Sequence, residues 1–164
     1  MNLQQDFKSL DYLAAAASQR IASGIGTKVK NDNTVEAAGL GNFATKALGV
    51  LQEQGVYALL IFLLSRSGKE TAVDKMTKEE FIACQHTGEL LNLLKKKELA
   101  APGVAYKEQL TVEGINSSKE AILKHFLQAG GILENLDKLL LIRDLYEQTL
   151  IYTRYAAKAR EEGK

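Results

Sequence analysis

The chain has 164 residues, 46% hydrophobic and 25% charged, which is typical of one globular domain. Its net charge of +1 indicates that any nucleic-acid site must be a local patch. The lone Cys84 excludes an internal disulfide and suits the reducing cytoplasm, and the first ten residues lack the pattern of a secretory signal. The longest apolar stretch, Val56 to Leu64, is about half of a membrane span. We therefore expect a single cytoplasmic domain over residues 1–164, without membrane contact.

Helical spacing of apolar residues predicts a first helix over Asn2 to Ser23, with Arg20 near its end, where the charge suits the helix dipole. A loop with paired glycines follows. Asn33 and Glu36 have the spacing of a capping box, so we expect the second helix to begin at residue 33 or 34. The segment from Gly39 to Ala44 formally matches a dinucleotide-binding fingerprint. Because no buried strand precedes it, we interpret its glycines as sites of close helix packing or weak points in a helix.

Gly55 interrupts this pattern and is followed by the apolar run Val56–Leu64. Periodicity alone cannot separate a buried strand from a buried helix here. The helical neighbours and the many Ala and Leu residues favour a helix, which we expect to be the central one and apolar on all sides. Arg66 and Lys69 near its end suit either of two roles, capping the helix carbonyls or holding phosphate groups.

Two capping boxes mark further helix starts. Thr77-Lys-Glu-Glu80 predicts a helix reaching about Lys97, with three lysines at its C-terminal end. Ser117-Ser-Lys-Glu120 predicts another, which Gly130-Gly131 ends. Between them, Ala100 to Asn116 is expected to be a connecting loop with room for one helical turn.

The last predicted helix, Leu139 to Glu162, contains no Gly or Pro and is the longest. One broad apolar face contains Leu141, Ile142, Leu145, Tyr146, Thr149, Tyr152, Thr153 and Ala156. Arg143, Arg154 and Lys158 fall within about 60° of one another on the other side. Leu140, Leu150 and Ile151 point away from the main face. We expect these three in a buried contact with another helix or subunit.

The predicted fold is therefore all-α, a compact bundle of about six helices with a long C-terminal helix. Two histidines and one cysteine are a poor inventory for nucleophilic or metal catalysis. Cys84 and His86 are too close in sequence to share a metal from one helical face, and no Glu-x-x-His pair occurs. We expect no enzyme activity, no metal, no cofactor and no small-molecule substrate.

Two segments resemble a known family. Ala47-Leu-Gly-Val-Leu-Gln-Glu-Gln-Gly-Val-Tyr-Ala-Leu-Leu-Ile-Phe-Leu-Leu-Ser-Arg-Ser-Gly-Lys-Glu70 is similar to a segment of the small helical subunit of type III-B CRISPR effector complexes, the Cmr small subunit. There, an apolar helix passes through a Gly-Leu step into a helix that ends in Phe-Leu, a small residue and a basic one. Leu145 to Lys158, with Tyr152-Thr-Arg-Tyr-Ala156, resembles the last helix of the same family. The first helix with Arg20 also fits the family's opening element.

The resemblance implies a non-catalytic, RNA-handling subunit. Its copies would stack head to tail into an inner filament that lines the groove of the guide RNA–target RNA duplex and stabilises the target RNA. Its partners would be copies of itself and the other Cmr-complex subunits, which would carry out any RNA cutting. Matched motifs assign Arg154 and Arg66 to RNA binding. Helix geometry adds Arg143 and Lys158, with Lys69 and Arg20 as further candidates.

The chain departs from the family at several positions. Leu48-Gly49 stands where a Pro is common before the Gly-containing step, Val56 replaces the usual Leu, and no Trp is present. Thr153 stands where a basic residue is frequent. Two alternatives remain open: the equivalent small subunit of type III-A complexes, and a helical protein–protein adaptor without direct RNA contact. In the adaptor, the arginines would form surface salt bridges that contribute little to stability.

Overall fold

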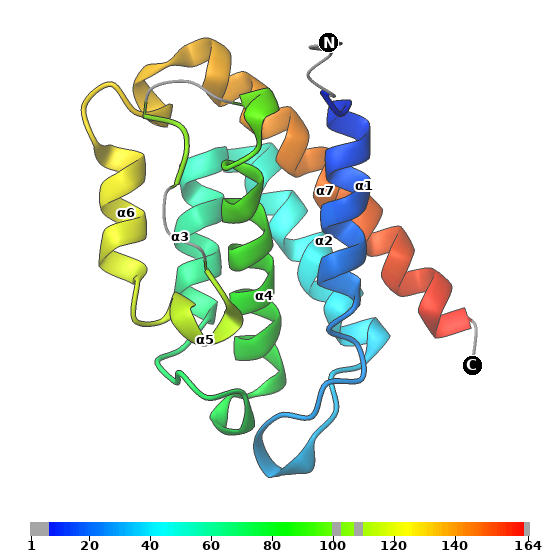
Figure 1. Cartoon of the computed structure of the whole chain (residues 1–164). Coiled ribbons are helices and arrows are strands. Elements are labelled where there is room, and N and C mark those ends of the chain that lie inside the picture. The colour runs from blue at the N-terminus through cyan, green and yellow to red at the C-terminus, as the bar shows by residue number, and fades with distance from the viewer. Residues whose placement is uncertain (1–6, 100–102, 107–109, 163–164) are drawn as a thin grey trace, which may run out of the picture.

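The computed structural model describes residues 7–99, 103–106 and 110–162. These residues form α1 (Leu10–Ala22), α2 (Ala37–Gln54), α3 (Val56–Arg66), α4 (Lys78–Leu93), α5 (Val112–Ile115), α6 (Lys119–Leu127) and α7 (Leu136–Glu162). Four short 3₁₀ helices lie between them. The predicted all-α bundle with a long C-terminal helix is confirmed (Figure 1). Within the described residues, no helix is both long and apolar enough to cross a membrane.

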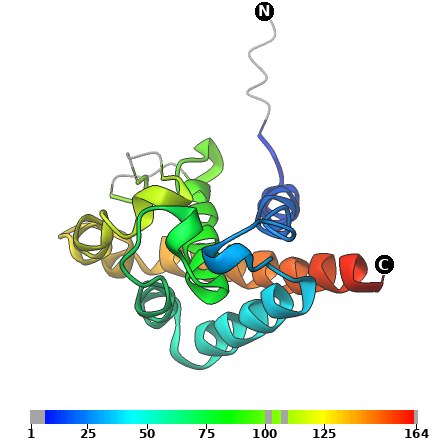
Figure 2. The ribbon, with the colours of Figure 1, turned by 90° about the horizontal axis from the view of Figure 1, so that it is seen from below.

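The central helix of the bundle is α4. Ten of its 16 residues are buried, and Figure 2 shows it near the middle, with α1 and α6 on opposite sides. The prediction that Val56–Leu64 forms a helix is confirmed, and Gly55, with φ 96°, separates it from α2. The run Val56–Leu64 is apolar on all sides, but the prediction that it forms the central helix is wrong. Ile61 on α3 is 40% exposed, because α3 packs mainly on α2 and α4 and leaves its outer face uncovered.

The long helix α7 packs between α1 and α2, and these are the most extensive helix contacts in the fold. Its predicted core face is mostly buried. Leu150 is fully buried as well, and Ile151 is half-buried, whereas Leu140 is 48% exposed. The prediction of a buried contact with another helix is confirmed for Leu150. Leu140 has no such contact within the chain, and a contact of Leu140 with another subunit stays a prediction. A helix held between two neighbours buries two faces, so Leu150 belongs to the core of this one chain.

The first two helices begin later than predicted. Ser9 caps α1, because its Oγ accepts the amide N–H of Tyr12 at 3.1 Å, and the predicted start at Asn2 lies outside the described residues. The expected capping box at Asn33 does not form. The chain is extended there, since the amide of Val35 donates to the carbonyl of Thr27, and α2 begins only at Ala37. A short backbone pairing with the preceding loop therefore outcompetes the local capping signal.

The two predicted capping boxes have different outcomes. At the start of α4, the Glu80 amide donates to Thr77 Oγ1, and the Thr77 amide donates to the Glu80 carboxylate. This capping box is confirmed, although α4 ends at Leu93 and a 3₁₀ turn covers Lys97–Leu99.

The prediction of a second capping box, Ser117-Ser-Lys-Glu120, is wrong. The hydroxyl of Ser117 donates instead to the carbonyl of Gly114, 3.1 Å away, and so completes the turn of α5. Helix α6 then begins at Lys119 without a side-chain cap. The preceding turn uses the serine that the capping box would need.

Candidate nucleic-acid interface

Arg154 and Lys158 line one shallow groove between the N-terminal half of α2 and the C-terminal half of α7. The groove has a volume of about 490 Å³. The side from α2 consists of Ala37, Ala38, Gly41, Asn42 and Thr45. The side from α7 consists of Arg154, Tyr155, Ala157, Lys158 and Glu161. Both basic side chains are exposed, and a single carboxylate, that of Glu161, lies among the lining residues.

The floor of the groove is built from small residues. A Cβ added at Gly41 would lie 3.3 Å from the Cβ of Ala157, which is tighter than ordinary van der Waals contact. Here the interpretation of Gly41 as a close-packing site is confirmed. No atom lies within 4 Å of the corresponding position at Gly39. Because short side chains leave the α2 backbone near the surface, the first turn of α2 opens directly into the groove.

The electrostatic field of the groove favours anions. Ala37 and Ala38 are the first residues of α2, and Glu36 before them makes no side-chain cap. The amide N–H groups of a helix's first turn have no partner inside the helix and carry its positive dipole end. This partial charge adds to the full charges of Arg154 and Lys158. The arrangement suits phosphate oxygens, which backbone amides and basic side chains both bind.

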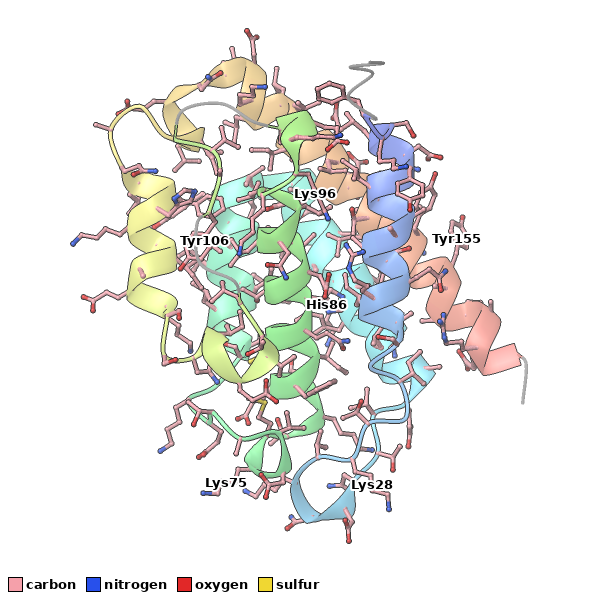
Figure 3. The ribbon with its side chains drawn as sticks, in the orientation of Figure 1. Lys28, Lys75, His86, Lys96, Tyr106 and Tyr155 are labelled. Atoms are coloured by element: carbon pink, nitrogen blue, oxygen red, sulfur yellow. The ribbon has the colours of Figure 1, made fainter. Side chains whose placement is uncertain are left out.

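An exposed aromatic ring lies beside these charges. Tyr155 is 70% exposed and lines the groove, and Figure 3 shows it on the outer side of α7 near α1. Exposed aromatic rings next to basic residues are typical of surfaces on which RNA bases stack. Tyr155 lies within the motif Tyr152-Thr-Arg-Tyr-Ala156, but the motif indicates no role for it. Its neighbour Arg154 was the available signal.

Three of the predicted arginines have partners elsewhere in the chain. Arg20 Nε lies 2.7 Å from a carboxylate oxygen of Glu89, and Arg66 Nη1 lies 2.9 Å from one of Glu79. The guanidinium of Arg66 also lies over the ring of Phe62, 5.2 Å from its centre.

Arg143 is separated from Arg154 along α7. Its Nη2 donates to the carbonyl of Gln52 at 3.1 Å and so caps the C-terminal end of α2. Arg143 and Arg154 share a helix face, but 11 residues at 1.5 Å place them about 16 Å apart. Arg154 and Lys158, in contrast, lie near the N-terminal end of α2.

Lys69 is exposed in the loop that follows α3. Within the described part of the chain it forms no ion pair. Its loop is held by Asn116 and Lys119, whose side chains donate to the carbonyls of Ser67, Gly68 and Glu70. The structure therefore places Arg154 and Lys158 in one groove and the other four predicted residues outside it.

The residues considered for catalysis are buried in the core. Burial raises the pKa of Cys84 to about 12, which leaves the thiol protonated and unreactive at neutral pH. Burial also lowers the pKa of His86 to about 4. Its Nδ1 lies 2.8 Å from the carbonyl oxygen of Ile82, a hydrogen bond that requires the proton on Nδ1. Among the described residues, no three His, Cys, Asp or Glu side chains are grouped to hold a metal ion.

Comparisons with protein-family models, curated proteins and solved structures found no match to this chain. The family resemblance therefore rests on the quoted sequence segments alone.

Proposed function

We propose that this protein is a non-catalytic, RNA-binding small subunit of a type III-B CRISPR (Cmr) ribonucleoprotein. In this proposal it stacks with copies of itself and with other Cmr-complex subunits in the cytoplasm, and it stabilises target RNA on the guide RNA. The observation that carries the proposal is the α2–α7 groove, in which Arg154, Lys158 and Tyr155 lie together. The α7 side of this groove largely falls within the second segment of family resemblance.

A near-neutral chain is compatible with RNA binding when several copies act along one strand. Two phosphate contacts per copy give weak binding, but contacts from copies in one assembly act together. Each neutralised phosphate of a single strand contributes about −0.7 to the slope of log affinity against log salt concentration. A filament with one groove per copy would therefore bind RNA strongly and with a steep salt dependence.

The alternative of a helical adaptor without RNA contact is favoured by a different observation. Arg20 and Arg66 form surface salt bridges with Glu89 and Glu79, the role that the adaptor assigns to the arginines. The equivalent type III-A subunit would use the same groove in a related assembly. The experiment below separates the adaptor from both RNA-binding subunits.

The test is the double variant Arg154→Gln/Lys158→Gln. The matched control is Lys28→Gln/Lys30→Gln, which removes two charges from exposed loop residues. We expect the groove variant to bind target RNA roughly tenfold more weakly, with a salt slope less steep by about 1.4, because two phosphate contacts are lost. Fluorescence anisotropy at several salt concentrations measures both quantities on the protein and on the assembled complex.

One control and two possible outcomes complete the test. Both replaced side chains in the groove are exposed, so the melting temperature should match that of the unmodified protein. Retention of target RNA by the assembled complex at unchanged affinity and salt slope would contradict the groove assignment. Normal assembly by a protein that never contacts RNA would favour the adaptor.

A further inference from the structure

We infer that two copies of the free protein pair through the outer face of α7, so that each copy covers the α2–α7 groove of the other. The partner is therefore a second copy of this chain, and its acidic side chain takes the place of RNA phosphate in the groove. The inference rests on the proposed function, because the pairing regulates the same RNA-binding groove.

The outer face of α7 changes in character along the helix. Its N-terminal half exposes two leucines, Leu136 at 67% and Leu140 at 48%, and the carboxylate of Asp144. Its C-terminal half exposes the guanidinium of Arg154 and the ring of Tyr155. At about 100° per residue, these five side chains fall within about 100° of one another, so they lie on one face of the helix. That face is apolar and acidic at one end and aromatic and basic at the other.

A shallow hollow between α1 and α7 lies beside the acidic half of this face. It has a volume of about 260 Å³ and is lined by Leu10, Asp11, Asp144, Leu145 and Gln148, with no basic residue among them. Asp11 accepts a hydrogen bond from the hydroxyl of Tyr152. Asp144 forms no ion pair or hydrogen bond within the described residues. The hollow therefore presents a carboxylate that has no partner in its own chain.

The basic half of the face has the complementary charge. Arg154 also forms no ion pair or hydrogen bond within the described part of the chain. Its groove is lined by one carboxylate, that of Glu161, and the Glu36 carboxylate before α2 lies 3.6 Å from the Lys78 ammonium. Asp144 and Arg154 are 10 residues apart on one helix, about 15 Å, which is too far for them to pair within one chain.

A two-fold axis satisfies both charges at once, because every contact in a symmetric pair of identical surfaces forms twice. Asp144 and Arg154 are equally far from position 149, and Leu140 and Tyr155 lie symmetrically about a point within half a turn of it. An axis that crosses α7 near Thr149 therefore brings Arg154 of each copy to Asp144 of the other and Tyr155 to Leu140. A different protein could supply a cation to Asp144, but a second copy uses both unpaired charges.

The pairing is expected to be weak enough for RNA to displace. A contact through one helix face buries less than the roughly 800 Å² per partner of a standard interface. Ion pairs between exposed side chains contribute little stability, and salt weakens them. RNA phosphate binds the same Arg154 and so competes with the second copy. The dimer therefore covers the groove in the free protein, and RNA opens it.

The experiment measures the molar mass of the full chain by analytical ultracentrifugation over about a hundredfold range of protein concentration. Asp144→Arg and Arg154→Asp each place like charges opposite one another, so each variant alone should dimerise roughly tenfold or more weakly than the unmodified protein. An equal mixture of the two variants restores both ion pairs and should form a heterodimer. The replaced side chains are exposed, so the melting temperatures should be unchanged.

The matched control is Asp74→Arg, the same charge change at an exposed position in the 3₁₀ helix Val73–Lys75. It should dimerise as the unmodified protein does. A second measurement adds fluorescein-labelled single-stranded oligouridine to the unmodified protein. We expect the RNA to convert the dimer into monomers bound to RNA.

Three results would overturn the inference: an unmodified protein that is monomeric at every concentration, no heterodimer from the mixed variants, and an equal loss in the Asp74→Arg control. A dimer that binds oligouridine without dissociating would show that the groove is open and would also overturn it.

The pairing and the proposed function fail separately. If the protein is always monomeric but Arg154→Gln/Lys158→Gln loses RNA affinity, the proposed function stands and the pairing is wrong. If the mixed variants form a heterodimer but no form of the protein binds RNA, the pairing stands and the proposed function is wrong.

Discussion

On one side of α4, helices α1 and α2 both pack directly on the long helix α7, whereas on the other side the short helices α5 and α6 combine a few buried apolar residues with hydrogen bonds to backbone carbonyls (Figures 1 and 2). The first side is built on small buried residues: Ala14, Ala17, Ala44, Ala47 and Ala157. Short side chains let helix backbones approach, so α1 and α2 each form a dense apolar interface with α7.

The side formed by α5 and α6 depends on directional contacts. Asn116 Nδ2 donates to the carbonyls of Ser67 at 2.8 Å and Glu70 at 2.7 Å, and Lys119 Nζ donates to that of Gly68 at 2.5 Å. His125 Nε2 lies 3.0 Å from the carbonyl oxygen of Val104. Three apolar residues of these helices, Ile115, Ile122 and Phe126, are buried as well. A region that depends on fewer buried apolar residues and on single hydrogen bonds opens locally at lower free energy than an extensively packed core. The two sides should therefore respond differently to mutation.

The largest expected effect is the loss of a core side chain of α7. Leu150→Ala should lower the free energy of unfolding by about 2–5 kcal/mol, because Leu150 is fully buried and the packed helices cannot close the cavity. Urea denaturation measures this change. The control is Leu140→Ala on the same helix, where 48% exposure predicts a change below about 1 kcal/mol. Equal effects of the two variants would contradict the assignment of Leu150 to the core.

A second effect is a pH dependence of stability caused by His86. The centre of its buried ring lies 4.9 Å from the centre of the Phe43 ring on α2. Burial lowers the pKa of His86 from 6.5 to about 4, so between these values the unfolded chain binds a proton that the folded chain does not. Stability should fall as the pH drops through this window, by up to about 1.4 kcal/mol per pH unit.

His86→Leu removes the titrating group and should flatten this part of the stability profile. Urea denaturation of both proteins at intervals from neutral to acidic pH measures the two slopes. Parallel profiles would show that His86 is not protonated on unfolding, against the burial described here.

The smallest expected effect is on the α5–α6 side. Asn116→Ala removes two hydrogen bonds and should cost about 1–3 kcal/mol. Hydrogen exchange should show faster opening of α5, α6 and the loop after α3, with α1 and α7 unchanged. Asn42→Ala, an exposed control on α2, should change stability by less than about 0.5 kcal/mol. Uniformly faster exchange over the whole chain would contradict the claim that the α5–α6 side opens independently of α1, α2 and α7.

Local sequence signals correctly predicted the ends of helices where no other group formed a hydrogen bond in place of the predicted one. Gly55 ends α2 because the chain needs a positive φ there, and Thr77 with Glu80 caps α4 through contacts three residues apart. The same reasoning failed at Asn33 and Ser117. At both positions a backbone or side-chain group of a neighbouring turn supplied a competing hydrogen bond.

By itself, the sequence determined the helices, the apolar face of α7 and the presence of basic residues on its other side. Only the tertiary structure decided which of these basic residues face an open groove. Arg20 and Arg143 have the same kind of local sequence context as Arg154, but their partners, Glu89 and Gln52, lie on other helices, 69 and 91 residues away in the chain. Whether a charged side chain forms an internal hydrogen bond or ion pair depends on which groups the packing of the helices brings within about 3 Å of it. Helical periodicity contains no information about those groups.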